Sequence, residues 1–221
     1  MPAKNSIKQY MEDGYYHLYN RGVEKRLIFM DRQDYAVFIS YLKEYLLPKD
    51  ENAMKEKLTD PNISSRERDK IIKTLRLNNF SSEISLLAYC LMPNHFHFLV
   101  KQKSAQSIDV FMQSLSTRYT MYFNRKYTRV GSLCQAVYKA SLVDNDEYLL
   151  HLSGYIHKQA INHSQASSYP EYAGERKTEW IKSDEILNYF SKNNPLFSYQ
   201  EFINQHTQPL LPQEMILDED I

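Results

Sequence analysis

Two neighbouring apolar segments, separated by three residues, constrain the fold most. Residues 84–91 (ISLLAYCL) form a continuous apolar run, and residues 95–101 (HFHFLVK) alternate along the chain. Met92-Pro93-Asn94 between them favours a tight turn, so the two segments predict a pair of antiparallel strands.

Other segments extend this pair into an α+β pattern. They are a strand at 14–22, a helix at 31–47, a helix along 108–123, a strand at 133–143, and a helix from Asp144, its predicted N-cap with Glu147 as capping-box partner, to about residue 164. The order strand, helix, strand, strand, helix, strand, helix predicts an antiparallel sheet with helices packed on it. We expect one domain at 14–165, interrupted by a charged helical insertion at 49–83, and a small C-terminal extension at 166–221.

Composition limits the class of protein. No apolar run approaches the roughly 18 residues that span a bilayer, and the N-terminus lacks the apolar core of a secretory signal. Cys90 and Cys134 lie far apart, which excludes a disulfide scaffold or a zinc knuckle and favours a reduced, cytoplasmic protein.

Charge is balanced overall but uneven along the chain. The sequence has 27 Lys and Arg and 27 Asp and Glu, which argues against a protein that coats nucleic acid by bulk charge. From Val110 to Val143, however, there is no acidic residue, and this stretch includes Arg118, Arg125 and Lys139. Such a basic segment is compatible with a polyanionic partner.

His95 and His97 are the sharpest local signal for chemistry. Residues i and i+2 of a strand point to the same face, so the two imidazoles project together. Two imidazoles on one face supply half of a transition-metal site. The alternative is a pair of histidines on a solvent-facing strand, with Phe96 and Phe98 on the buried face.

The predicted helix from Asp144 carries a second polar pattern. His151, Tyr155, Gln159 and His163 are spaced by four residues and form one stripe. A tyrosine there can act as a nucleophile if its neighbours help it to ionise. The alternative is a half-buried tyrosine whose hydroxyl meets solvent.

These parts together resemble the single-tyrosine HUH transposases, which include insertion-sequence transposases and REP-associated tyrosine transposases. The matching stretches, in the family's order, are YYHLYNRGVEKRLIFMDRQDY (15–35), LLAYCLMPNHFHFLVK (86–101), GSLCQAVYKASLVDNDEYLLHL (131–152) and GYIHKQ (154–159). Residues 167–187 also resemble the C-terminal extension of the REP-associated branch. The resemblance implies the HUH endonuclease fold, which is ferredoxin- or RRM-like.

The resemblance also implies roles for individual residues. The family's histidine–hydrophobe–histidine motif falls on His95 and His97 as metal ligands, its nucleophile on Tyr155 and its third ligand on Gln159. The family's sequence after the tyrosine resembles IHLNP, whereas this chain has IHKQA at 156–160. Without the proline the helix should continue, so His163 could replace or supplement Gln159. His151 could accept the tyrosine proton, although the resemblance does not support a base there.

The implied activity is metal-dependent nicking and joining of single-stranded DNA beside a hairpin. It would use Mg²⁺ or Mn²⁺ and a 5′-phosphotyrosine intermediate, in a monomer or a homodimer. Candidate phosphate contacts, each with a solvated surface charge as its alternative, are Arg21, Arg118, Arg125 and Lys139. Two other functions stay open: a non-catalytic hairpin-binding descendant of the fold, and a metal-dependent hydrolase that uses the histidines as zinc ligands.

Overall fold

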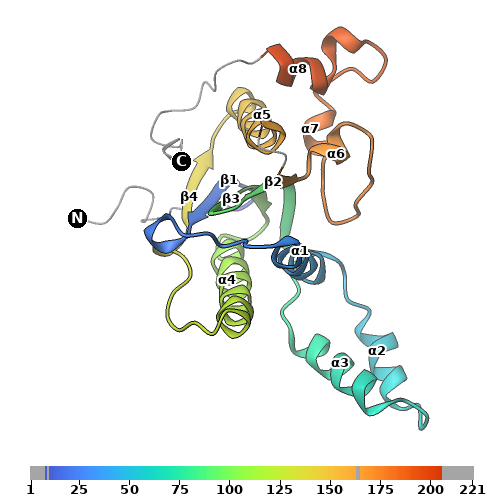
Figure 1. The fold of residues 1–221 in the computed structure, drawn as a ribbon. Coiled ribbons are helices and arrows are strands. Elements are labelled where there is room, and N and C mark those ends of the chain that lie inside the picture. The colour runs from blue at the N-terminus through green and yellow to red at the C-terminus, as the bar shows by residue number, and fades with distance from the viewer. Residues whose placement is uncertain (1–7, 9, 163–164, 206–221) are drawn as a thin grey trace.

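A five-stranded sheet forms the centre of the protein (Figure 1). The structure, a computed structural model, describes residue 8 and residues 10–162 and 165–205. The strands are β1 (Tyr15–Arg21), β2 (Ile84–Met92), β3 (His95–Gln102), β4 (Lys139–Val143) and β5 (Ala166–Ser167). Their order is β4-β1-β3-β2-β5, and every neighbouring pair is antiparallel. The predicted α+β class, an antiparallel sheet with packed helices, is confirmed.

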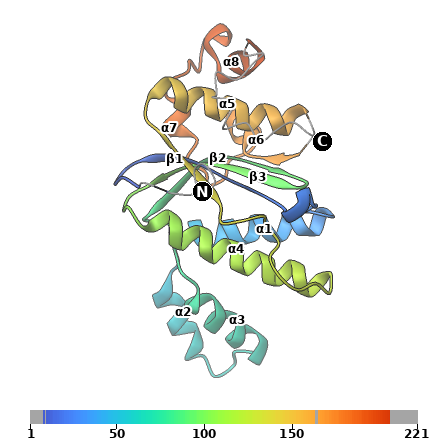
Figure 2. The same cartoon turned by 90° about the vertical axis from the view of Figure 1, so that its left-hand side faces the viewer.

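Helices cover both faces of this sheet (Figures 1 and 2). They are α1 (Arg32–Leu46), α2 (Glu51–Leu58), α3 (Ser65–Arg76), α4 (Ser107–Lys126), α5 (Asp146–Asn162), α6 (Tyr169–Tyr172), α7 (Asp184–Leu187) and α8 (Tyr199–Gln205), with 3₁₀ turns η1 (Val23–Lys25) and η2 (Pro195–Phe197). Helices α1 and α4 lie on one face, and α5 with the C-terminal helices lies on the other. None of the helices in the described ranges is long and apolar enough to cross a membrane.

The strand alternation creates two separate cores. Leu18, Phe96 and Phe98 pack toward α1 and α4, while Leu87 and Leu99 join the apolar side of α5. Because both faces are covered, His97 has no exposed surface. The structure therefore contradicts, for His97, the alternative of histidines on a solvent-facing strand.

Two predicted boundaries were wrong. Strand β4 begins at Lys139 rather than 133. Residues 133–135 lie outside this strand and pair with the last residue of β1 and the two residues that follow it. Leu133 O accepts from Val23 N at 3.0 Å, and Gln135 N donates to Arg21 O at 2.9 Å.

The N-cap of α5 also differs from the prediction. The carboxamide oxygen of Asn145 accepts from the backbone N–H of Tyr148 at 2.7 Å. The cap is therefore Asn145, one residue after the predicted Asp144.

The predicted insertion is a helical arm, α2 and α3, that projects away from the sheet (Figures 1 and 2). Neither helix contains a buried residue. The base of the arm is held by two side chains: Lys49 Nζ donates to Leu77 O at 2.6 Å, and Asn79 Nδ2 donates to Leu47 O at 2.6 Å. The chain therefore leaves the domain and returns to it at one place.

The described part of the C-terminal extension packs against α5 and β2. His157, fully buried on α5, contacts the Tyr199 hydroxyl through Nδ1 at 2.7 Å and the Ser168 hydroxyl through Nε2 at 2.8 Å. Tyr172 donates to Leu87 O on β2 at 3.0 Å. These bonds join the extension to the helix that carries Tyr155.

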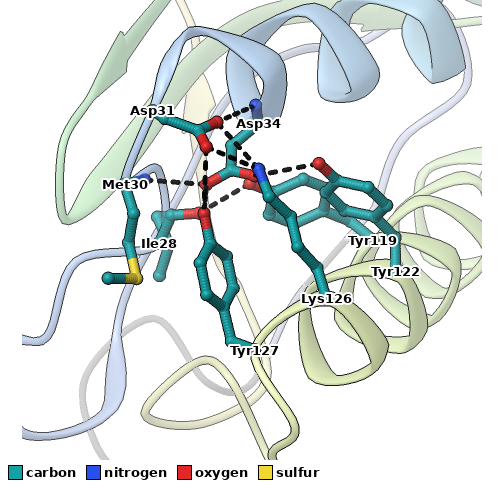
Figure 3. A network of polar contacts seen from close by, with 8 residues as sticks. All are labelled: Ile28, Met30, Asp31, Asp34, Tyr119, Tyr122, Lys126 and Tyr127. Atoms are coloured by element: carbon teal, nitrogen blue, oxygen red, sulfur yellow. Dashed lines mark hydrogen bonds and ion pairs between the residues drawn. The ribbon is translucent and has the colours of Figure 1, made fainter.

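A buried carboxylate joins α1 to the C-terminal end of α4 (Figure 3). Asp34 accepts from Met30 N, the Tyr122 and Tyr127 hydroxyls and Lys126 Nζ, at 2.8 to 2.9 Å. Burial raises the pKa of Asp34, but these donors outweigh that effect and hold its pKa below the usual value.

We predict that Asp34→Asn lowers the free energy of unfolding by about 2–4 kcal/mol, because it removes the charge that four donors require. Urea denaturation at pH 7 measures the loss. Glu44→Gln, which breaks the more exposed pair with Arg118 at 2.7 Å, is the control and should cost about 1 kcal/mol or less.

The difference between wild type and Asp34→Asn should also depend on pH. Since folding lowers the pKa of Asp34, its stabilisation is fully present above the unfolded-state pKa of about 4 and is lost as the pH falls through the folded value. A difference that stayed constant down to about pH 3 would contradict this assignment.

Candidate active site

The turn between β2 and β3 fixes the start of the histidine strand. Pro93 O accepts from the backbone N–H groups of Ile28 and Phe29, and Asn94 O accepts from Gly22 N at 2.8 Å. A Cβ on Gly22 would lie 2.2 Å from the carbonyl oxygen of Arg26, so only glycine permits this close approach. The loop after β1 thus holds the turn that precedes His95.

His97 lies at the centre of the sheet face under α5. Its pKa is well below the usual value, first because it is buried and then because His17 and His95 are near. It is therefore neutral at physiological pH. Its Nδ1 lies 2.8 Å from Nε2 of His17, while its Nε2 is buried and has no hydrogen-bond partner among the described residues.

His95 is half-buried beside it. The two rings are 5.1 Å apart and nearly perpendicular. His95 Nδ1 lies 2.6 Å from the carboxamide oxygen of Asn94. Because that oxygen can only accept, Nδ1 carries a proton, and in the neutral ring Nε2 keeps its lone pair.

Tyr155 on α5 lies over this pair. Its ring centroid is 5.7 Å from that of His97, edge to face. Its hydroxyl oxygen accepts from Gln159 Nε2 at 2.6 Å, and Gln159 Oε1 accepts from the Cys90 thiol at 3.9 Å. The structure therefore links all four predicted site residues, His95, His97, Tyr155 and Gln159, through side-chain contacts.

The donor set suits a weakly held metal ion. Among the described residues, no group of three or more His, Cys, Asp and Glu side chains is placed to hold one. A metal ion at His95 and His97 therefore needs a third ligand of another kind, and the Gln159 carboxamide oxygen is one turn from Tyr155. The unpartnered Nε2 of His97 is the atom that such an ion would use.

His151, another histidine of the predicted stripe, lies beside α8. His151 lies one turn before Tyr155, and its ring lies 5.7 Å from that of Phe202 in α8. Its Nε2 is also 3.9 Å from Glu147. His163 lies outside the described residues.

The four predicted phosphate contacts fall on two sides of the sheet. Arg21 is opposite His95 in the β1–β3 register, and Lys139 Nζ is 5.7 Å from the Tyr19 ring, which stacks on His97. These two cations lie on the Tyr155 side.

Arg118 and Arg125 lie instead on α4, across the sheet. Arg118 is paired with Glu44 at 2.7 Å and stacks on Tyr41, whereas Arg125 is exposed.

Sequence reasoning missed His17 and Cys90. His17 is fully buried, and burial lowers its pKa to about 3. The signal for it was the alternation of the first strand, which puts Tyr15, His17 and Tyr19 on one face. Cys90 is opposite His97 in the β2–β3 register; its strand has no alternation that marks a face.

Comparisons with known proteins agree with the motifs. No curated protein matches the chain. One solved structure, a REP-associated tyrosine transposase bound to a REP hairpin, has 10% identity and a TM-score of 0.46, covering 80% of this chain and 95% of its own. Another, a putative transposase from Deinococcus radiodurans R1, has 15% identity and a TM-score of 0.28, covering 72% and 98%. Residues 55–159, which include the histidine pair, Tyr155 and Gln159, match the model of the family described as "Transposase IS200 like", which confirms the family resemblance predicted from the motifs.

Proposed function

We propose that the protein is a transposase-like enzyme that nicks and joins single-stranded DNA through Tyr155. The observation that carries this proposal is the position of Tyr155: its ring lies against His97 and its oxygen is hydrogen-bonded to Gln159. The match to the IS200-like transposases over residues 55–159 supports the reaction class.

In the proposed reaction the phenolic oxygen of Tyr155 attacks the phosphorus of a DNA phosphodiester. The bond from phosphorus to O3′ breaks, the bond from phosphorus to the tyrosine oxygen forms, and the departing O3′ takes up a proton as the phenol loses one. The products are a 5′-phosphotyrosine and a free 3′-hydroxyl. Because the phosphodiester is conserved, a second 3′-hydroxyl can reverse the step and join strands without ATP.

The amide of Gln159 would assist this step. Its Nε2–H already donates to the Tyr155 oxygen, and a donor at this position favours negative charge on the phenol. We propose His95, His97 and the Gln159 carboxamide oxygen as the ligands of Mg²⁺ or Mn²⁺. A bound divalent ion would polarise a non-bridging oxygen of the scissile phosphate.

The proposed substrate is a single strand beside a DNA hairpin, as the family resemblance implies. Tyr155 is only 9% exposed, so a flexible, unpaired backbone suits it better than a stiff duplex. Arg21 and Lys139 are proposed contacts near the cleaved phosphate. Arg118 and Arg125 are proposed contacts only for a substrate that also reaches α4. The free thiols Cys90 and Cys134 suit the proposed cytoplasmic location.

Tyr155→Phe should abolish covalent protein–DNA adducts and leave hairpin binding intact, because it removes only the nucleophilic oxygen. Labelled single-stranded hairpins, incubated with Mn²⁺ and separated on a denaturing gel, report the adduct. Tyr148→Phe, on the same helix, is the matched control and should form the adduct normally.

Three results would redirect the proposal. An adduct in Tyr155→Phe would exclude this nucleophile. A released 5′-phosphate with no adduct in the wild type would favour the hydrolase alternative, and hairpin-selective binding with neither product would favour the non-catalytic one.

His95→Ala should slow adduct formation about 100-fold or more, the usual loss when one electrostatic stabiliser is removed. EDTA should stop the wild-type reaction. The control is His151→Ala, on the same helix, since the ring of His151 lies beside that of Phe202 in α8; it should react at close to the wild-type rate. Equal rates for His95→Ala and wild type would contradict the ligand assignment.

Lys139→Gln should lower the slope of log affinity against log salt by about 0.7 for a single strand, the value for one lost phosphate contact. Fluorescence anisotropy at several salt concentrations measures this slope. With a short strand, Arg125→Gln should keep the wild-type slope, because Arg125 lies across the sheet from Tyr155. A lower slope for Arg125→Gln alone would place the bound strand on α4.

A further inference from the structure

The contact between His17 and His97 determines which nitrogen of His97 is available. Both rings are fully buried, and a single proton lies between His17 Nε2 and His97 Nδ1, which are 2.8 Å apart. If His97 Nδ1 carries that proton, His97 Nε2 keeps a lone pair. If His17 Nε2 carries it, His97 Nε2 is protonated and cannot bind a metal ion.

The two arrangements differ in which buried N–H needs an acceptor. In the second arrangement it is Nε2–H of His97, and in the first it is Nδ1–H of His17; neither nitrogen has a hydrogen-bond partner within the described residues. A buried N–H without an acceptor costs about 1–3 kcal/mol. An acceptor next to His17 therefore favours the first arrangement.

Ser141 is the candidate acceptor next to His17. It is directly opposite His17 in the β1–β4 register, and cross-strand partners have Cβ atoms about 4.5–5.5 Å apart. The hydroxyl of Ser141 and Nδ1 of His17 are both buried, and neither has a hydrogen-bond partner in the part of the chain that the structure describes. When His17 accepts through Nε2, its own proton is on Nδ1. That is the nitrogen of His17 that can donate to the Ser141 hydroxyl.

We propose that His17 is a positioning residue for the candidate metal centre: its Nε2 accepts the Nδ1 proton of His97 and leaves Nε2 of His97 for the metal ion. In the proposed arrangement the Ser141 hydroxyl, which has no hydrogen-bond partner within the described residues, accepts the Nδ1 proton of His17. This inference rests on the proposed function, because it assigns the orientation of a proposed ligand. Carbonyl and carboxylate groups usually orient ligating histidines; here a third imidazole on the neighbouring strand does so.

Mn²⁺ binding to the purified full-length protein, measured by titration calorimetry without DNA, tests the proposal. His17→Leu keeps an apolar side chain in the buried space but removes the acceptor, and we expect it to weaken Mn²⁺ binding about 10–100-fold. His17→Gln is the matched variant, because its carboxamide oxygen lies near the position of Nε2. It should bind Mn²⁺ within a few-fold of wild type.

Unchanged Mn²⁺ affinity in a folded His17→Leu variant would overturn the inference while leaving the metal centre in place. No Mn²⁺ binding by the wild type would overturn the metal centre of the proposed function itself. The two failures are therefore distinguishable.

A second measurement needs no variant and applies if His17→Leu does not fold. Nitrogen-15 NMR of the histidine rings in the metal-free wild type reports the tautomer of His97. A proton on Nδ1 of His97 supports the role of His17, and a proton on Nε2 overturns it.

Discussion

Burial of the sheet face beneath α5 controls the chemistry of the candidate site. A histidine in water carries a charge for part of the time near neutral pH, but His17 and His97 are fully enclosed and neutral. Neutral imidazoles are metal ligands, whereas protonated ones are not. The same enclosure means that a buried polar atom needs a partner, so the unpartnered Nε2 of His97 marks a position where a ligand fits.

The cover over this face depends on the C-terminal extension. His157 is two residues after Tyr155 and is bonded to both Tyr199 and Ser168. Ser168 in turn accepts from the backbone N–H of Tyr89 on β2 at 2.8 Å. The helix with Tyr155 is therefore fixed to the sheet through a second set of contacts.

Sequence patterns predicted the helices and strands better than the contacts between them. The alternation of residues 95–101 correctly put both histidines on one face, and the four-residue spacing put Tyr155 and Gln159 in contact. Local patterns of this kind depend only on helix and strand geometry.

Long-range pairing was beyond such patterns. The partner of Arg118 is Glu44, far away along the chain, so the basic segment from 110 to 143 gave no indication that Arg118 is already paired. The role of residues 133–135 was missed for the same reason: they pair with the end of β1 and with the residues that follow it, and strand propensity does not reveal these partners. The contact of His17 with His97 depends on the register of two strands that are distant in sequence.

The helical arm has a consequence for how this domain tolerates change. Its two ends are tied together by Lys49 and Asn79, and its helices bury nothing in the core. The whole insertion is therefore equivalent to a closed loop attached to the sheet at one place. The entropic cost of closing such a loop grows only with the logarithm of its length. Residues can be gained, lost or exchanged beyond this tie without moving β2, so the arm can diversify while the strand register beneath Tyr155 stays constant.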